Sequence, residues 1–163
     1  MKNCVKYINE KIVLWIIEED NKVTDISFSD PNLNVTDSSV LNCAMKEIEE
    51  YFKGQRRDFT FPISLAGTKF QVNTWNEMKK IKYGEVVTYK ELTSRVTNKK
   101  AYRAVGSACN KNRLPIVIPC HRVVSSTGIG GYAGGLDIKK LLLKIEKASV
   151  QMNWCLFLLI NYF

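Results

Sequence analysis

The chain has 163 residues, enough for one domain or for two small domains that share a core. Its hydrophobic share of 45% and charged share of 25% are ordinary for a globular protein, which excludes a disordered chain. Five cysteines without a C-x-x-C pair, a single histidine and no secretory signal exclude a disulfide framework and argue against a zinc site. We therefore expect a reducing, cytoplasmic setting, mostly free thiols and no metal.

The net charge of +8 is unevenly distributed along the chain. Residues 69–113 hold 11 Lys and Arg against 3 Asp and Glu, a net charge of +8. Residues 1–68 hold 8 against 11, a net charge of −3. Such asymmetry favours a polyanionic partner of the middle segment. The alternative is a lysine-rich surface that only contacts solvent.

Residues 1–67 are expected to form a small amino-terminal α+β domain. Strands are expected within residues 4–17, 23–29 and 59–65. Asp37 or Ser38 is expected to cap a helix of apolar residues at helical spacing, and Gly54 is a plausible end for it. No catalytic group of residues is evident in this half.

Residues 68–163 are expected to form a second, mostly helical domain. Helices are expected at residues 68–81, 89–95 and 101–109. Thr88 and Glu91 have the spacing of a capping box at the start of the second of these helices. Two short helices joined by a basic turn outline a helix-turn-helix, and the small residues of the last helix would permit close approach to a DNA groove. Most helix pairs bind nothing, but the surrounding lysines and arginines favour DNA.

Cys120 and His121 follow a short apolar run. Residues 116–118 predict a buried strand that Pro119 ends, because proline has no backbone N–H to donate. A thiol and the only histidine then stand side by side, the residue types of an activated nucleophile and its base. The alternative is an inert core thiol beside an imidazole that is satisfied within the core.

Five glycines lie between Gly128 and Gly135, where the backbone can approach a ligand closely. A phosphate-binding loop is disfavoured, because the P-loop lysine and the dinucleotide-binding spacing are missing. Asp137 is expected to cap a last helix that ends near Glu146. Its inward-facing residues are expected to be Ile138, Leu141, Leu142 and Ile145. The apolar residues 154–163 are too few to span a bilayer and are expected to pack on the core or against another chain.

The hexapeptide from Pro119 to Val124 resembles the active-site signature of the O6-alkylguanine-DNA alkyltransferases, also called methylated-DNA–protein-cysteine methyltransferases. Residues 84–89 resemble the segment that leads into the first DNA-contacting helix of that family, and residues 103–106 resemble its recognition helix. Asn112, the glycine loop with Tyr132, and Glu146 also follow the family's order and spacing. The match covers about residues 70–146. Three positions depart from the usual pattern: Thr74, Lys82 and Ala133.

The resemblance implies a fold and an activity. The fold is α+β, with a small α/β amino-terminal domain and a mostly helical domain with a winged-helix-like helix-turn-helix and a short active-site strand. The activity is DNA repair by direct reversal. An alkyl group moves irreversibly from O6-alkylguanine, and also from O4-alkylthymine, to Cys120 after nucleotide flipping. The protein acts once, without a cofactor, on double-stranded DNA and as a monomer.

The resemblance also implies roles for individual residues. His121 acts on Cys120 through a water and is oriented by Glu146, while Asn112 ties the helix-turn-helix to the active-site strand. Tyr89 rotates the phosphate and protonates the departing guanine, and Arg103 fills the gap in the base stack. Further DNA contacts fall on Thr88, Arg95, Lys100 and Ala101. The base pocket is lined by Pro115, Val123, Tyr132, Ala133 and Gly134.

Two other classes of function stay open from the sequence. One is a lesion sensor or helix-turn-helix regulator that binds DNA without reacting, although such sensors lack the reactive cysteine. The other is a cysteine hydrolase built on Cys120 and His121, although those enzymes place the histidine far from the cysteine in sequence.

Overall fold

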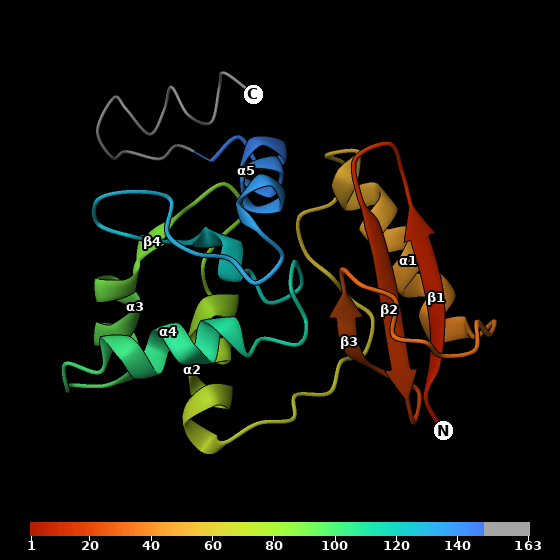
Figure 1. Ribbon diagram of the computed structural model, residues 1–163, viewed down its shortest axis with the longest axis horizontal. Coiled ribbons are helices and arrows are strands. Elements are labelled where there is room, and N and C mark those ends of the chain that lie inside the picture. The colour runs from red at the N-terminus through yellow and green to blue at the C-terminus, as the bar shows by residue number, and fades with distance from the viewer. Residues whose placement is uncertain (149–163) are drawn as a thin grey trace. The chain divides into compact units, whose positions relative to one another are not determined.

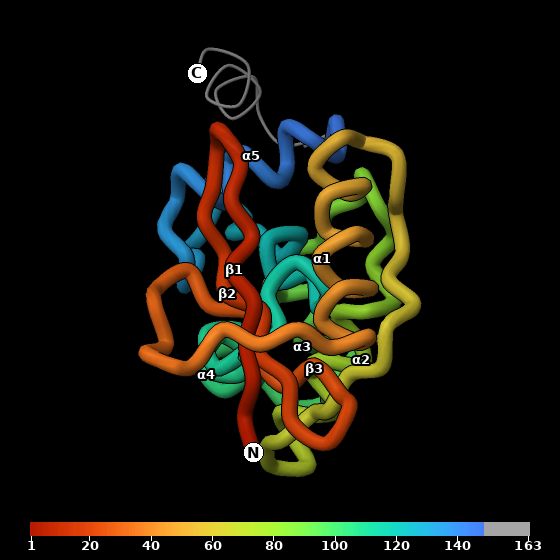
Figure 2. Tube along the Cα trace, turned by 90° about the vertical axis from the view of Figure 1, so that its right-hand side faces the viewer, coloured from red at the N-terminus to blue at the C-terminus, as the bar shows by residue number. Residues whose placement is uncertain are grey.

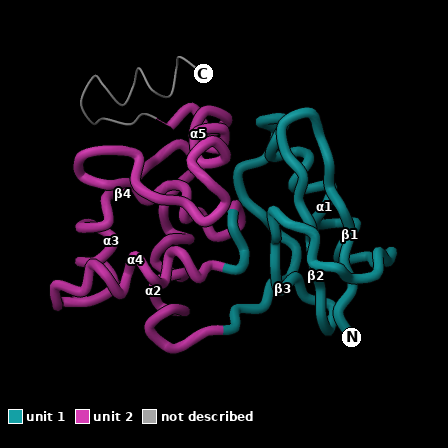
Figure 3. Tube along the Cα trace, in the orientation of Figure 1, with its two compact units in different colours: residues 1–66, 113–115 teal, residues 67–112, 116–163 magenta. Residues whose placement is uncertain are grey.

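The computed structural model describes residues 1–148, so the prediction for the apolar tail and Cys155 lie outside the described residues. Contacts divide the chain into two compact units, shown in teal and magenta in Figure 3. Unit 1 comprises residues 1–66 and 113–115, and unit 2 comprises residues 67–112 and 116–163. The α+β class is confirmed. A separate domain for residues 1–67 and another for residues 68–163 stays a prediction.

Unit 1 contains a three-stranded antiparallel sheet in the order β1-β2-β3 (Figure 1). The strands are β1 (Asn3–Ile8), β2 (Val13–Glu19) and β3 (Lys22–Ser27). The segment 4–17 thus contains parts of two strands, because the chain turns at Asn9, whose Oδ1 accepts the N–H groups of Lys11 and Ile12 at 2.8 and 2.9 Å.

Helix α1 (Ser39–Phe52) packs along this sheet (Figure 2). Of the two expected caps, Ser38 is the N-cap, and its hydroxyl accepts the Leu41 N–H at 3.1 Å. The buried residues of the helix include Leu41, Ala44, Ile48 and Tyr51, which recur at helical spacing. The helix of this half was therefore predicted correctly.

The strand expected at residues 59–65 is wrong. Ile63 forms only an isolated bridge with Val23, and no strand is present there. Two backbone hydrogen bonds make up that bridge: Val23 N–H donates to the Pro62 carbonyl and Ser64 N–H donates to the Val23 carbonyl, both at 2.9 Å. Buried Glu47 of α1 accepts both the backbone N–H and the hydroxyl of Thr60, so a side chain rather than a ladder binds the start of the segment.

Unit 2 contains four helices among its described residues: α2 (Lys69–Lys79), α3 (Tyr89–Val96), α4 (Tyr102–Asn110) and α5 (Leu136–Ile145). Capping boxes begin the first two, formed by Thr68 with Gln71 and by Thr88 with Glu91. The helix-turn-helix is α3 followed by α4. Trp75 on α2 donates its indole N–H to the Ala108 carbonyl on α4 at 2.8 Å, which supports the second helix of the pair.

The chain around Cys120 is a turn where a strand was expected. Residues 116–118 are not a strand, although Ile116 and Ile118 are each only 1% exposed. Ile116 has φ +75°, in the left-handed region that branched side chains disfavour. A single 3₁₀ turn, η1 (Cys120–Arg122), follows Pro119. The short strand is β5 (Val123–Val124), which pairs in parallel with β4 (Val87–Thr88) after the cysteine rather than before it.

Helix α5 differs from its prediction at its start and on its buried face. Gly135 is the N-cap, and no side chain caps the helix. Asp137 lies inside the first turn and is not the cap. The buried residues are Lys139, Leu142 and Leu143. The other three residues expected to face inward, Ile138, Leu141 and Ile145, are only partly buried. Periodicity predicted the helix, but of the four residues expected to face inward only Leu142 is buried.

None of the helices within residues 1–148 is long and apolar enough to cross a membrane.

Ser38→Ala should lower the free energy of unfolding of unit 1 by about 1 kcal/mol, because the Leu41 N–H loses its acceptor. Urea unfolding followed by far-ultraviolet circular dichroism measures the change. Ser39→Ala is the matched control, since Ser39 is the exposed first residue of the helix. Equal losses in the two variants would contradict the capping role of Ser38.

Candidate active site

Cys120 is a buried thiol held by a neighbouring amide. Its side chain and backbone are 6% exposed, and its N–H donates to the Ile118 carbonyl at 2.8 Å. The Asn112 amide nitrogen donates to the same carbonyl at 2.8 Å and approaches Cys120 Sγ at 3.2 Å. Asn112 follows the C-cap residue of α4, so its amide connects the end of the helix-turn-helix with the turn that carries the thiol.

The surroundings of Cys120 act on its pKa in opposite directions. Burial raises the pKa of the thiol, whereas the Asn112 amide, the Lys139 charge and the Tyr132 hydroxyl lower it. The direction overall is upward, so the resting group is a thiol. A base is therefore needed to produce the nucleophilic thiolate.

His121 and Glu146 form a buried hydrogen-bonded pair. His121 Nε2 lies 2.7 Å from Glu146 Oε1, and both side chains are fully buried. His121 Nδ1 has no hydrogen-bond partner among the described residues. Because a 3₁₀ turn advances about 120° per residue, Cys120 and His121 do not point to opposite sides as they would in a strand. This pairing over 25 residues of sequence was implied by the resemblance alone.

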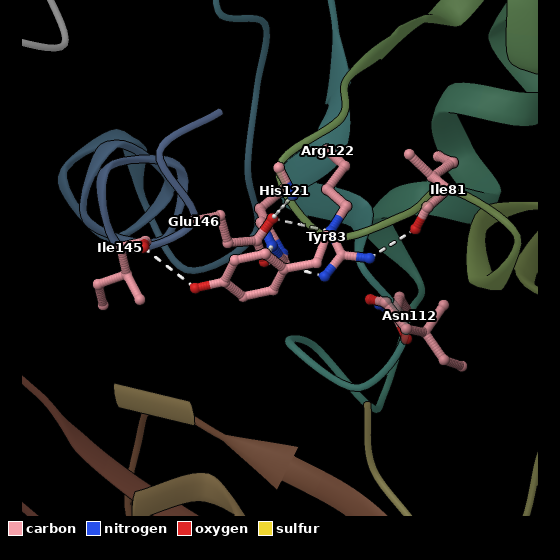
Figure 4. Close-up of polar contacts among 9 residues, drawn as sticks. Ile81, Tyr83, Asn112, His121, Arg122, Ile145 and Glu146 are labelled. Carbon is pink, nitrogen blue, oxygen red and sulfur yellow. Dashed lines mark hydrogen bonds and ion pairs between the residues drawn. The ribbon is translucent and has the colours of Figure 1, made fainter. Parts of the chain in front are cut away.

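Arg122 forms hydrogen bonds with both oxygens of the Glu146 carboxylate (Figure 4). Its Nε donates to Glu146 Oε2 at 2.9 Å and its Nη2 donates to Oε1 at 3.0 Å. Its Nη1 reaches the Ile81 carbonyl at 2.5 Å, and the Gly84 N–H adds a bond to Oε2 at 3.2 Å. Sequence reasoning did not assign Arg122 to the site, although its position next to His121 was a usable signal.

These contacts determine the charge states of the pair. Burial alone would raise the pKa of Glu146, but the hydrogen bonds and charges of His121 and Arg122 lower it to about 2. Burial lowers the pKa of His121, and Glu146 opposes that shift. The carboxylate thus stays ionised and accepts the Nε2 proton, which leaves the lone pair of neutral His121 on Nδ1. A neutral imidazole in this tautomer can act as a base.

The residues expected to contact DNA lie on and between α3 and α4. Arg95, Lys100 and Arg103 are exposed, at the end of α3, in the turn, and in the first turn of α4. Ala101 is the N-cap of α4. Thr88 instead caps α3, and its hydroxyl lies 2.8 Å from Glu91 Oε2. The roles of all five in DNA binding stay predictions.

Tyr89 is the first residue of α3 and is half-buried. Burial, with smaller contributions from Cys109 and Cys120, raises the pKa of its hydroxyl to about 12. It therefore keeps its proton at neutral pH and can donate it. Tyr132 interacts with Cys120, and burial raises the pKa of its hydroxyl well above the ordinary value as well.

The other expected pocket residues have different exposures. Val123 is fully buried on β5, Gly134 is partly buried and Ala133 is exposed in the glycine loop. Pro115 is buried and belongs to unit 1, so its part in the pocket stays a prediction.

The positive charge is concentrated in the unit that carries the thiol. Unit 2 holds 15 Lys and Arg against 5 Asp and Glu, a net charge of +10, whereas unit 1 holds 9 against 11, a net charge of −2. Within residues 1–148, no three His, Cys, Asp or Glu side chains are grouped as metal ligands would be. The site thus combines a buried thiol, a base and a basic helix pair.

Two family models match nearly the whole described chain. Residues 69–148 match the 6-O-methylguanine DNA methyltransferase DNA-binding domain, and residues 13–65 match the ribonuclease-like domain of the same proteins. The chain belongs to the 6-O-methylguanine DNA methyltransferase family. The expected family is thereby confirmed, including for the amino-terminal half, which the sequence matched only in general character.

Relatives from archaea and bacteria agree with this assignment. A methylated-DNA–protein-cysteine methyltransferase of Methanosarcina acetivorans is 42% identical over 135 residues, covering 79% of this chain and 86% of the relative. The constitutive methylated-DNA–protein-cysteine methyltransferase of Bacillus subtilis is 38% identical over 150 residues, covering 85% and 91%.

Solved structures of the family are similar over most of the chain. The crystal structure of the Mycobacterium tuberculosis O6-methylguanine methyltransferase matches with a TM-score of 0.81 and 28% identity, covering 96% of this chain and 99% of that one. The Mycobacterium tuberculosis protein in complex with DNA matches with a TM-score of 0.81 and 29% identity, covering 89% and 93%.

The depressed pKa of Glu146 predicts loss of stability in acid. The ordinary pKa of 4.5 falls to about 2 on folding, so the unfolded chain binds a proton that the folded chain does not. The carboxylate therefore stabilises the fold above about pH 5, and on the order of 2–3 kcal/mol should be lost as the pH falls towards 2. Urea unfolding at a series of pH values measures this loss.

Glu146→Gln should be less stable at neutral pH, because Arg122 loses its counter-charge, and its stability should vary less between pH 5 and pH 3. The control is Glu85→Gln, which removes an exposed carboxylate of the same unit and should keep the wild-type pH dependence. A wild-type pH slope in Glu146→Gln would contradict the assignment.

Proposed function

We propose that this chain repairs DNA by moving an alkyl group from O6-alkylguanine to Cys120. The observation that carries the proposal is the buried Glu146–His121 hydrogen bond of 2.7 Å in a turn that begins with a thiol held by Asn112. This set of groups can deprotonate a thiol in the absence of bulk water. The DNA-binding family domain and a relative solved in complex with DNA support DNA as the partner.

The proposed reaction balances without a cofactor. His121 Nδ1 takes the Cys120 proton through a bridging water, and Glu146 stabilises the imidazolium that forms. Sγ then attacks the first carbon of the alkyl group, so an S–C bond forms as the C–O6 bond breaks. Tyr89 donates a proton to the departing guanine, and the thiol proton replaces it by way of His121. The products are a Cys120 thioether and unmodified guanine.

The proposed DNA complex uses α3 and α4. A thiol that is only 6% exposed cannot reach a base inside a stacked duplex, so the target nucleotide must be flipped out, at a cost of a few kcal/mol. Arg103 is exposed in the first turn of α4 and is suited to fill the gap. The exposed Ala104 and Ser107 of the same helix are small, which suits close approach to a groove.

The protein is proposed to act once, as a monomer. A thioether is chemically stable, and an onward transfer would need a second acceptor. Three further thiols lie within the described residues, and their hydrogen bonds go to other groups: Cys4 to the Leu33 carbonyl, Cys43 to Glu47 and Cys109 to Met78. O4-alkylthymine is proposed as a further substrate of the same thiol.

With excess duplex DNA containing O6-methylguanine, the wild type should remove one methyl group per protein. Intact-protein and peptide mass spectrometry should place the methyl group on Cys120. Cys120→Ala should transfer nothing, whereas Cys43→Ala, which removes an exposed thiol in unit 1, should transfer as the wild type does.

Three results would contradict the proposal. More than one methyl removed per protein would exclude single turnover. Tight binding of the lesion with an unmodified Cys120 would favour a lesion sensor instead. Slow peptide or ester cleavage by Cys120→Ser would revive the hydrolase.

Arg103→Ala should slow methyl transfer from duplex DNA and leave the reaction with the free base O6-benzylguanine within about threefold of wild type, because only the duplex has a stack to fill. Single-turnover rates at several salt concentrations measure the effect. The control Lys46→Ala removes a cation from unit 1 and should not change either rate. Equal losses on both substrates would show that Arg103 acts on the site rather than on the duplex.

A further inference from the structure

Lys139 is a buried cation to which the proposed reaction assigns no step. It lies on α5 with 0% exposure, and no carboxylate lies within ion-pair distance of its Nζ among the described residues. Removing an ammonium group from water costs several kcal/mol unless other polar groups replace the water. A methionine or leucine would fill the same helical position without that cost, so the ammonium group has a purpose beyond packing.

The groups that replace water are two backbone carbonyls. Lys139 Nζ donates to the Val123 carbonyl at 2.6 Å and to the Gly131 carbonyl at 3.0 Å. Val123 is the first residue of β5, directly after the turn that carries Cys120. Gly131 immediately precedes Tyr132 in the glycine loop. One ammonium group therefore joins the two segments that hold Val123 and Tyr132, both expected to line the base pocket.

The glycine loop lies close against this contact. Gly130 has φ +72°, and a Cβ there would lie 3.1 Å from the Ser125 nitrogen, 3.2 Å from Tyr89 Cε2 and 3.6 Å from Lys139 Nζ. These distances leave no room for a side chain. The loop thus packs on Tyr89 and Lys139 together, and its path depends on both.

The ammonium form is the one that can hold both carbonyls. Burial lowers the pKa of Lys139 to about 8, and the neighbouring thiols Cys120 and Cys109 oppose this shift. At neutral pH the group therefore remains mostly protonated. Hydrogen bonds from a charged donor are about twice as strong as neutral ones, which suits a contact that must keep a glycine-rich loop in place.

We infer that Lys139 is a positioning residue that fastens the glycine loop to β5 and thereby holds the base pocket in the shape that presents the alkyl group to Cys120. The inference rests on the proposed function, because it assigns a positioning residue to the pocket used in that reaction. Lys139 acts through the glycine loop and the Val123 carbonyl, not through contact with the alkyl group.

The test compares two reactions of the same thiol. Methyl transfer from a duplex oligonucleotide containing O6-methylguanine needs the base pocket, whereas alkylation by iodoacetamide needs only a reactive Cys120. Lys139→Met should slow methyl transfer roughly tenfold to a hundredfold, because a misplaced reacting group costs rates of that order. Its reaction with iodoacetamide at Cys120 should slow much less, because there only the contribution of the Lys139 charge to the pKa of the thiol is lost.

Matched variants separate the loop from general effects. Lys139→Arg keeps a charged donor and should recover much of the methyl transfer, while Lys79→Met makes the same change at an exposed residue of α2 and should behave as wild type. If Lys139→Met does not fold, Lys139→Gln, which is polar but uncharged, is measured in the same two reactions and should show the same selective loss.

Four results are decisive. Unchanged methyl transfer in a folded Lys139→Met protein would overturn the inference, and so would parallel losses in both reactions, which would mean that Lys139 acts on the charge of the thiol. A wild-type protein that reacts with iodoacetamide but not with methylated DNA would overturn the proposed function itself. A selective loss of methyl transfer, with recovery in Lys139→Arg, would support the inference.

Discussion

The buried carboxylate of Glu146 is the interaction on which the second unit depends. It is the C-cap residue of α5, and it binds the imidazole of His121, the guanidinium of Arg122 and the backbone N–H of Gly84. A charge with 3% exposure is tolerable only because these partners replace the water that folding removes. The same contacts keep it ionised and orient His121. Stability and the readiness of the base therefore come from one set of hydrogen bonds.

Much of unit 2 could be predicted from the sequence because its signals are local. Thr88 begins α3 through a capping box that its spacing to Glu91 makes visible, and the apolar spacing of residues 70–81 indicates α2. The thiol and the histidine were likewise found from their neighbours in the chain. The family motif then added what local signals cannot carry, namely that Glu146 reaches His121 across 25 residues.

The predictions that failed depended on contacts distant in sequence. The run from Ile116 to Ile118 is as apolar as a buried strand, but burial alone does not distinguish a strand from a buried turn. Residues 59–65 form only one bridge to β3, and the start of the segment is bound by the buried Glu47 of α1, a contact 13 residues distant in sequence. Lys139 was not among the residues expected to face inward, and lysine is almost never fully buried without a partner. Its two carbonyl partners become visible only in three dimensions.

Ile116, in the turn before Cys120, must meet two opposing requirements. Its φ of +75° would suit glycine or asparagine, whereas its exposure of 1% demands a large apolar side chain. Glycine would relieve the backbone and leave a cavity, and a polar residue would suit the backbone but lack water. Each single substitution thus exchanges one defect for another of a few kcal/mol. The turn before the thiol therefore tolerates few single substitutions at Ile116, and the backbone limits this tolerance as well as the chemistry.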